Sequence, residues 1–172
     1  MNAQVLRKRA RLLLLFFVAA LLVSGITAFP LEWELNVLSR LVAAPASPVP
    51  ALWPDLVTWI NRVNAGWQDT YRQYPFIAYG TDWLAFAHIV IAIVFWGPLR
   101  DPVKNIWVVE FGMIACMLVV PLALICGPLR EIPFFWRLID CSFGILGFIP
   151  LWMARKDIQR IVALEKVVWP SV

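Results

Sequence analysis

The stretch Asn105–Leu129, NIWVVEFGMIACMLVVPLALICGPL, contains a single charged residue, Glu110, in 25 positions. About 20 apolar residues in helical conformation cross the hydrocarbon core of a bilayer, which is about 30 Å thick. A continuous apolar run of this length does not suit a helix on the surface of a soluble domain, which needs a polar face. The stretch therefore predicts a membrane-spanning helix.

The chain contains three further apolar segments, two before this stretch and one after it. Segment 12–29 carries no charge, segment 83–99 contains only His88 as an ionisable group, and segment 133–154 includes Arg137 and Asp140. The connections between the last three spans are short, so these spans should be sequential antiparallel neighbours. The sequence predicts an all-α polytopic membrane protein, a single membrane domain over 1–172 in which four helices form an antiparallel bundle.

The composition supports a membrane protein and excludes other classes. Of the 172 residues, 62% are hydrophobic and 15% charged, against about 45–50% and about 25% in soluble domains. This excess excludes a soluble globular enzyme, and the abundance of apolar residues excludes a disordered chain. The net charge is +4, but the basic residues gather beside apolar runs, which favours anionic lipid headgroups over nucleic acid as their partner.

Positive charge is divided unevenly between the two sides of the predicted bundle. Ten basic residues fall on one side: Arg7, Lys8, Arg9, Arg11, Arg100, Lys104, Arg155, Lys156, Arg160 and Lys166. Five fall on the other side: Arg40, Arg62, Arg72, Arg130 and Arg137. Because Lys and Arg accumulate in cytoplasmic segments, we expect both termini in the cytoplasm, with the chain in a bacterial-type inner (plasma) membrane.

Tryptophans at the span ends agree with this orientation. Trp83 and Trp136 fall at the predicted outer ends, whereas Trp96, Trp107 and Trp152 fall at the inner ends. Tryptophan is enriched at both membrane–water interfaces. The positions of these side chains therefore support the predicted span boundaries.

The two ends of the chain allow further predictions. The first span follows a basic segment, as the apolar core of a secretory signal peptide does. Since Ile26 before Ala28 makes a poor small-x-small cleavage site, we expect the span to be retained. After the last span, 155–172 is predicted to continue as a cytoplasmic helix at the inner surface, with Arg155, Lys156 and Arg160 facing headgroups.

Residues 30–82 connect the first two spans and are predicted to form an outer amphipathic helical loop. Segment 31–42 and segment 55–74 place apolar residues at spacings of three and four, which is typical of helices. Asp55 is the predicted N-cap of the second helix. We interpret both helices as lying along the outer membrane surface. A lid or a docking surface for a partner is the alternative, favoured by the tryptophans Trp33, Trp53, Trp59 and Trp67.

The tetrapeptide Gly-Pro-Leu-Arg occurs twice, at Gly97–Arg100 and Gly127–Arg130. A duplicated helix unit, as in transporters with inverted repeats, is one explanation. Nothing else around the two copies aligns well, and each copy ends a predicted span. Gly suits a helix C-terminus, Pro prevents continuation and Arg complements the negative end of the helix dipole, so we favour a shared stop signal.

Two ionisable residues are predicted to reach one level inside the membrane. With a rise of about 1.5 Å per residue, His88 lies roughly 9 Å beyond Asp82, and Asp140 lies roughly 10 Å beyond Pro133. Such groups are costly unless they are paired or hydrated, which makes each a candidate functional residue. Arg137 precedes Asp140 by three positions, within reach of an intrahelical ion pair.

Three interpretations of this polar cluster remain open. The first is a structural ion pair that fixes helix register, and the second is a binding site with Asp82, Arg130 and Glu131 at its rim. The third is proton handling by His88 and Asp140 in an enzyme or carrier. One histidine and one aspartate are fewer ligands than a metal site needs, so we predict no metal or cofactor.

Glu110 is the remaining charge within a predicted span, about five residues from its inner end. We expect this inner-side buried charge to pair with Arg155 or Lys156 rather than to relay protons. Cys116, Cys126 and Cys141 form no Cys-x-x-Cys motif. A disulfide between Cys126 and Cys141 is a minor alternative.

We therefore expect a non-enzymatic inner-membrane protein that binds a small molecule, a lipid or a partner subunit through its outer polar cluster and Trp-rich loop. A membrane enzyme or carrier using His88 and Asp140 is the alternative. Apart from the lipid bilayer, a partner membrane subunit or a second copy is possible, because Gly144 and Gly147 allow a neighbouring helix to approach closely.

Overall fold

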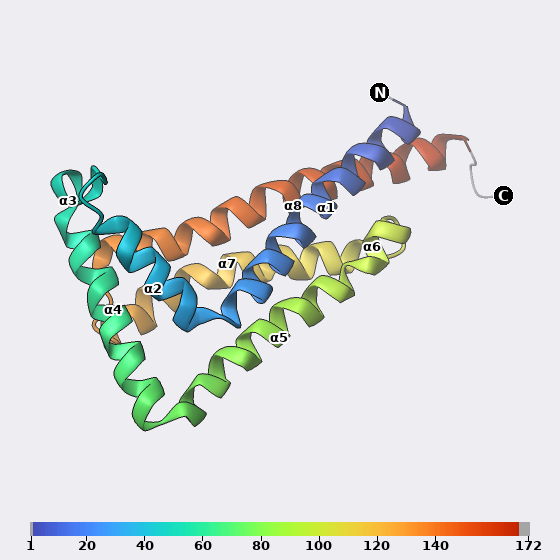
Figure 1. Cartoon of the computed structure of the whole chain (residues 1–172). Helices are drawn as coiled ribbons and strands as arrows, with labels where there is room; N and C mark the ends of the chain where they lie inside the picture. The colour runs from blue at the N-terminus through green and yellow to red at the C-terminus, as the bar shows by residue number, and fades with distance from the viewer. Residues whose placement is uncertain (1, 169–172) are drawn as a thin grey trace. The chain divides into compact units, whose positions relative to one another are not determined.

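The computed structural model describes residues 2–168, and within them every regular element is helical. The elements in chain order are α1 (Ala3–Ala28), α2 (Leu31–Val42), α3 (Val49–Leu52), α4 (Pro54–Gln73), the 3-10 helix η1 (Pro75–Ala78), α5 (Tyr79–Val94), α6 (Trp96–Arg100), α7 (Ile106–Leu129) and α8 (Phe134–Val168) (Figure 1). The prediction of an all-α fold is confirmed. The final part of the predicted C-terminal helix, 169–172, and the side chain of Lys166 lie outside the described residues.

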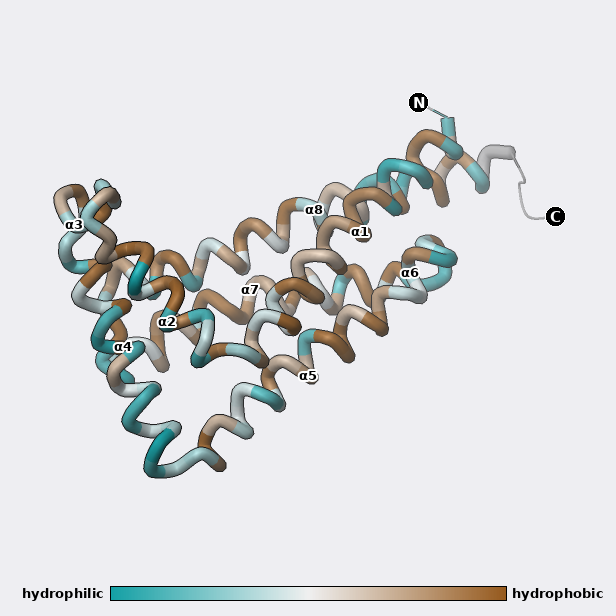
Figure 2. Tube along the Cα trace, viewed as in Figure 1, coloured by the Kyte–Doolittle hydropathy of each residue, from teal (hydrophilic) through white to brown (hydrophobic). Residues whose placement is uncertain are grey.

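Four helical segments are long and apolar enough to cross a membrane. They are Ala3–Ala28, Pro75–Arg100, Ile106–Leu129 and Phe134–Glu165, and Figure 2 shows hydrophobic residues along each of them. Large apolar side chains are exposed on all four, for example Phe16 (65%), Trp96 (68%), Leu122 (61%) and Phe143 (66%). These helices indicate a multi-pass membrane protein, because exposing so much apolar surface to water is unfavourable, whereas contact with the acyl chains of lipids is not.

Three of the four segments extend well beyond the predicted spans, since Pro75–Arg100 begins before the predicted start at Trp83 and both α1 and α8 are longer than expected. Helix α1 begins at Ala3, so Arg7 and Arg9 belong to it, and α8 continues past Ala154 as one helix to Val168. The charged residues that follow Ala154 are good helix formers, and no glycine or proline interrupts them before Val168. Polar sequence therefore ends the hydrophobic run but not the helix.

The regular helix of segment 75–100 is interrupted at Phe95, where α5 gives way to α6. Helix α5 ends at Val94, whose carbonyl would require an N–H at position 98, and Pro98 has none. Helix α6 ends before Asp101, whose φ of −136° and ψ of 91° are extended. Asp101 precedes Pro102, and a residue before a proline favours the extended region of backbone conformation.

The glycines of the two Gly-Pro-Leu-Arg copies act differently from the prediction, because both lie inside helices. The Asn105 side chain packs on Gly97 and donates to its carbonyl oxygen at 3.2 Å. Gly127 lies beneath the side chain of Arg137. Both glycines therefore provide room for a neighbouring side chain rather than a helix C-cap.

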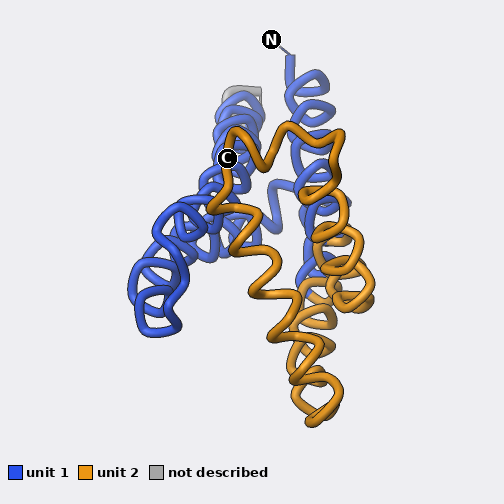
Figure 3. The backbone as a smooth tube through the Cα atoms, turned by 60° about the vertical axis from the view of Figure 1, so that its left-hand side comes forward, with its two compact units in different colours: residues 1–21, 91–172 blue, residues 22–90 orange. Residues whose placement is uncertain are grey.

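The chain forms two compact units, drawn in different colours in Figure 3. Unit 1 comprises the chain up to Leu21 and from Ile91 onward, and unit 2 comprises Leu22–Val90. Helices α1 and α5 each contribute one part to each unit.

An antiparallel hairpin of α7 and α8 forms the frame of unit 1. Glycines allow these helices to lie close together: a methyl group added at Gly144 would lie only 2.5 Å from the carbonyl oxygen of Cys116. Near the other end of the hairpin, a methyl group on Gly112 would lie 2.9 Å from Leu151. The small-residue surface predicted at Gly144 therefore faces α7.

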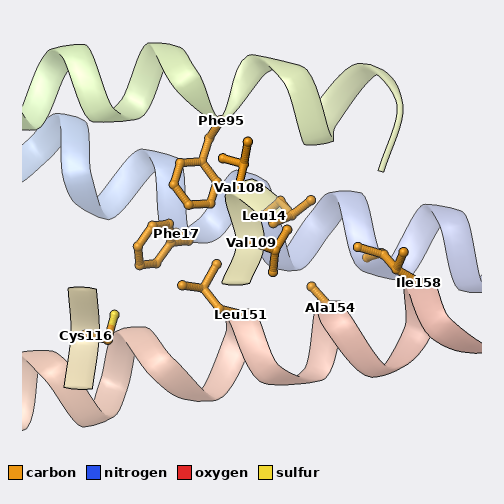
Figure 4. Close-up of a cluster of buried hydrophobic side chains, with 10 residues drawn as sticks. Leu14, Phe17, Phe95, Val108, Val109, Cys116, Leu151, Ala154 and Ile158 are labelled. Carbon is orange, nitrogen blue, oxygen red and sulfur yellow. The ribbon is translucent and has the colours of Figure 1, made fainter. Parts of the chain in front are cut away.

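The apolar core of unit 1 gathers side chains from α1, α7, α8 and the end of α5 (Figure 4). Phe95 and Leu14 are fully buried, and Leu151 of α8 is buried with them. The rings of Phe17 and Phe95 are 4.9 Å apart between centroids and tilted by 47°. Between membrane-spanning helices, such close packing stabilises the core through van der Waals contacts rather than through transfer out of water.

Helices α2 and α4 pair in unit 2 in antiparallel orientation. Ser39 donates to Asn61 Oδ1 at 2.6 Å, and Asn64 donates to Asn36 Oδ1 at 3.3 Å. The predicted helix 31–42 has the observed bounds. The prediction of Asp55 as the N-cap of the next helix is wrong: α4 begins at Pro54, because proline is preorganised for the first helical position.

Candidate binding cavity

The predicted site residues are divided between the two units. Asp82 and His88 belong to unit 2, whereas Glu110, Arg130, Glu131, Arg137 and Asp140 belong to unit 1. The approach of His88 to Asp140 involves both units and stays a prediction.

His88 lies in α5 where this helix contacts α1. A methyl group at Gly25 would lie 3.0 Å from both the His88 Cβ atom and the Ala85 carbonyl oxygen, so the glycine permits close contact. The His88 Nδ1 atom is 2.8 Å from the carbonyl oxygen of Leu84. In the tautomer with a proton on Nδ1, the ring donates to this oxygen, which leaves Nε2 as an acceptor.

Arg137 does not form the predicted ion pair with Asp140. Its side chain extends over Gly127, and its guanidinium carbon lies 5.2 Å from the ring centroid of Phe134. The Arg137 side chain is therefore directed toward α7 and toward the preceding turn of α8 rather than toward Asp140. Within the described part of the chain, Asp140 is in no ion pair.

Arg130 and Glu131 terminate α7. The N–H of Ile132 donates to the Gly127 carbonyl at 3.0 Å, and that of Glu131 donates to the Pro128 carbonyl at 3.1 Å. Glu131 has a φ of 55°, which completes the hydrogen-bonded stop known as a Schellman motif. The backbone conformation at Glu131 thus turns the chain toward α8.

Glu110 accepts a hydrogen bond from Arg155 Nε at 2.8 Å, which confirms the pairing predicted across α7 and α8. The side chains of Glu110 and Arg155 are 42% and 34% exposed, so this charge is only half-buried within the unit. Lys156 instead places its Nζ atom 3.6 Å from the ring centroid of Trp152. At this distance the ammonium group of Lys156 is attracted to the face of the Trp152 ring.

A buried acid in α8 was missed by the sequence analysis. Asp157 is 1% exposed, and its carboxylate lies 3.2 Å from Arg9 Nε and 4.0 Å from Arg160 Nη1. A second ion pair between α1 and α8 joins Arg7 to Glu165. The available signal was that Asp157 continues the apolar stripe of α8 next to Ile158, where an unpaired charge would be costly.

The cysteines do not form a reactive cluster. Cys116 and Cys141 are buried and Cys126 is exposed, all three as free thiols. Within residues 2–168, no group of three or more His, Cys, Asp or Glu side chains is arranged to hold a metal ion.

Asp82 lines a cavity of about 490 Å³ that lies entirely within unit 2. The lining residues come from the end of α1, from α2, α4 and η1, and from the start of α5: Phe29, Pro30, Glu32, Trp33, Trp67, Tyr71, Pro75, Ala78, Tyr79, Thr81 and Asp82. Small-molecule sites have volumes of about 300–1,000 Å³. This cavity has the size of such a site.

An adjoining cavity of about 290 Å³ shares Asp82, Tyr79 and Phe29 with the first, and Trp83 and Phe86 complete its lining. Its aromatic rings meet edge to face. The Tyr79 and Trp83 centroids are 6.0 Å apart at 76°, and those of Trp83 and Phe86 are 5.8 Å apart at 89°. Asp82 is thus the acidic residue of a mainly aromatic surface.

Negative charge characterises the larger cavity. Glu32 lies in the first turn of α2 and Asp82 in the first turn of α5, where the partial positive charge of a helix N-terminus stabilises carboxylates. The lining contains no basic residue. Among the residues that the structure describes, neither Glu32 nor Asp82 has an ion-pair partner.

Trp67 adds an unsatisfied donor to this lining. Its indole N–H is buried and has no acceptor within the described range 2–168. Buried polar groups in native proteins nearly always have hydrogen-bond partners, so an orphaned donor requires an explanation. Because this nitrogen is buried, a group bound in the cavity could reach it only if the indole ring moved.

Sequence analysis identified Asp82 but not the residues that surround it. Glu32 was not among the predicted site residues, and Trp33 and Trp67 were predicted only as part of a possible docking surface. The sequence signal was the pair of carboxylates at two helix starts, each followed by a tryptophan, Trp33 and Trp83. Their convergence depends on the tertiary fold, which the spacing alone does not reveal.

No family model, curated protein or solved structure matches this chain. The shape, lining and charge of the cavity therefore provide the basis for assigning a function.

Proposed function

We propose that this chain is a non-enzymatic multi-pass protein of a bacterial-type inner membrane that binds a small molecule or lipid headgroup around Asp82. In this proposal the four spans form an antiparallel bundle, both termini are cytoplasmic and residues 30–82 lie on the outer side. The excess of basic residues in the terminal segments and the 100–104 connection supports this orientation.

The observation that carries the proposal is the cavity of about 490 Å³ that combines Trp33, Trp67 and Asp82. It joins the Trp-rich loop to a polar residue at the start of a candidate span. Aromatic walls with a few polar groups are typical of ligand sites. The lining contains no histidine, cysteine or lysine, which favours binding over catalysis.

Native mass spectrometry of the detergent-solubilised chain tests binding. We expect a co-purifying mass that is lost in Trp67→Ala, because truncation removes an aromatic wall of the cavity. Trp107→Ala is the matched control, since Trp107 is 61% exposed in unit 1 and lies outside the cavity. An adduct that survives Trp67→Ala, or is absent from the wild-type chain after gentle extraction, contradicts the proposal.

Cysteine labelling in intact cells tests the orientation separately. In a Cys126→Ser background, a membrane-impermeant maleimide should label Ala46→Cys, in the connection between α2 and α3, but not Lys104→Cys. Both positions are exposed, so accessibility to the reagent alone distinguishes them. The opposite labelling pattern would place the cavity on the cytoplasmic side.

The alternative function, a membrane enzyme or carrier, depends on His88 and Asp140. The Nδ1 atom of His88 is engaged by its own helix, so only Nε2 remains for proton exchange. This geometry favours a structural role for His88, and we therefore retain the binding protein as the proposal.

A further inference from the structure

Building on the proposed binding function, we propose that the cavity around Glu32 and Asp82 recognises an organic ammonium group, such as the trimethylammonium of choline-type compounds. The first argument is charge. Two carboxylates line the cavity and no Lys, Arg or His does. An anionic ligand would meet repulsion from both carboxylates, whereas a cation would neutralise groups that lack an ion-pair partner among the described residues.

Aromatic side chains provide the second argument. Trp33, Trp67, Tyr71 and Tyr79 line the same cavity as the two carboxylates. The face of an aromatic ring attracts a cation within about 6 Å, and aromatic cages are a recurrent means of binding quaternary ammonium groups. A methylated ammonium needs no hydrogen-bond acceptors, so rings can enclose it where they could not satisfy a hydrated ion.

The lining also disfavours an inorganic cation. Calcium takes six to eight oxygen ligands, and magnesium demands nearly ideal octahedral geometry. The cavity offers the carboxylates of Glu32 and Asp82, but most of its remaining wall is aromatic or proline. Apolar rings compensate poorly for removing a metal ion from water, but they contact the methyl groups of an organic ammonium favourably.

The smaller cavity extends the site toward the apolar part of α5. It begins at Asp82 and reaches Phe86, one helical turn further along α5, with Trp83 beside it. An ammonium near Asp82 could therefore have its alkyl portion against Trp83 and Phe86. This arrangement suits both a free ammonium compound and the headgroup of a lipid such as phosphatidylcholine.

Isothermal titration of the full chain in a maltoside detergent tests the charge requirement. The probes are choline and its neutral isostere 3,3-dimethyl-1-butanol, which has the same shape without the charge. We expect choline to bind and the isostere to bind at least about tenfold more weakly, a difference that cation–π attraction and carboxylates together can produce. Equal binding of both probes, or no binding of choline, overturns the proposal.

Variants then test the assigned carboxylates. Glu32→Gln and Asp82→Asn should each weaken choline binding by about tenfold, while Asp69→Asn, an acid of α4 outside the cavity lining, should leave it unchanged. Unaltered binding in both cavity variants overturns the assignment. If a variant fails to fold, as judged by size-exclusion chromatography, the comparison of choline with its isostere on the wild-type chain still decides.

Two lipid environments distinguish the source of the ammonium. Choline binding that is abolished in nanodiscs of phosphatidylcholine but retained in phosphatidylglycerol identifies the lipid headgroup as the ligand. Equal binding in both nanodiscs identifies a free ammonium compound, and both outcomes support ammonium recognition. A co-purifying ligand that Trp67→Ala removes, combined with no choline binding, overturns the ammonium assignment and leaves the proposed binding function intact.

Discussion

The two compact units differ in the surroundings of their partly or fully buried acidic residues. In unit 1, Asp157 contacts Arg9 and Arg160, and Arg155 donates to Glu110. In unit 2, Glu32 and Asp82 line a cavity without a basic residue. Acids that are paired within the protein connect helices and contribute to stability, whereas acids that face a cavity remain available for a ligand.

The overall charges of the units follow the same contrast. Unit 2 contains five acidic residues and three basic ones, whereas unit 1 contains six acidic and twelve basic residues. In unit 1, Arg9 and Arg160 are partners of Asp157 and Arg155 is the partner of Glu110, whereas Asp140 is in no ion pair within the described residues. Unit 2 has too few cations to match its acids, which is consistent with a site for an external cation.

Removing the partner of the buried acid should have the largest effect on stability. Arg9→Met leaves Asp157, which is 1% exposed, with only the more distant Arg160. Breaking a buried pair costs about 3–5 kcal/mol, and because Arg9 is itself 43% exposed we expect about 2–3 kcal/mol. Thermal unfolding of the purified chain in detergent measures this loss.

Lys8→Met is the matched control, because Lys8 is an exposed neighbour of Arg9 on α1, and it should change stability by less than about 0.5 kcal/mol. The double variant Arg9→Met with Asp157→Leu should recover most of the loss, since an apolar pair can replace a buried ion pair. Equal effects of Arg9→Met and Lys8→Met would refute the structural role of the pair.

The glycines offer a second comparison between the units. In unit 1, Gly144→Ala should destabilise by about 1–3 kcal/mol, because its methyl group would press on the Cys116 carbonyl oxygen, a backbone atom. In unit 2, Gly66→Ala on α4 meets nothing within 4 Å and should stabilise by about 0.5–1 kcal/mol through helix propensity. Thermal unfolding of both variants checks the signs; destabilisation of similar size at both positions would contradict this difference.

The helices were largely predictable from the sequence because their signals are local. Apolar runs gave the four long segments, and spacings of three and four gave the α2 range Leu31–Val42. The ends of α1 and α8 were missed because hydropathy marks the membrane boundary, whereas the backbone continues until a breaking residue occurs. Asp55 was wrongly predicted as an N-cap, because the proline before it, Pro54, is already the first residue of α4.

The site was only partly predictable, because its residues come from separate elements. Asp82 was recognised by its position at a span end, but Glu32 becomes its neighbour only through packing within unit 2. The ion pair of Asp157 with Arg9 likewise joins opposite ends of the chain. Arg137 and Asp140 show the converse error: sequence spacing suggested a pair, but the Arg137 side chain lies over Gly127 and beside the Phe134 ring instead.

Neutralising the cavity acids should affect stability far less than disrupting Asp157. Asp82→Asn and Glu32→Gln each remove only a favourable interaction with a helix N-terminus, worth about 0.3–1 kcal/mol. We therefore expect a loss below about 1 kcal/mol in thermal unfolding. A loss as large as that of Arg9→Met would show that these carboxylates have structural partners, and the contrast between the units would fail.

The smallest effect is expected at the half-exposed pair of unit 1. Glu110 and Arg155 are 42% and 34% exposed, and exposed ion pairs contribute about 0–1 kcal/mol because solvent screens them. A double-mutant cycle with Glu110→Gln and Arg155→Met should give a coupling energy in this range, measured by thermal unfolding in detergent. A coupling energy well above about 1 kcal/mol would show that the pair is not screened as an exposed pair is, and Glu110 would then behave as a buried charge.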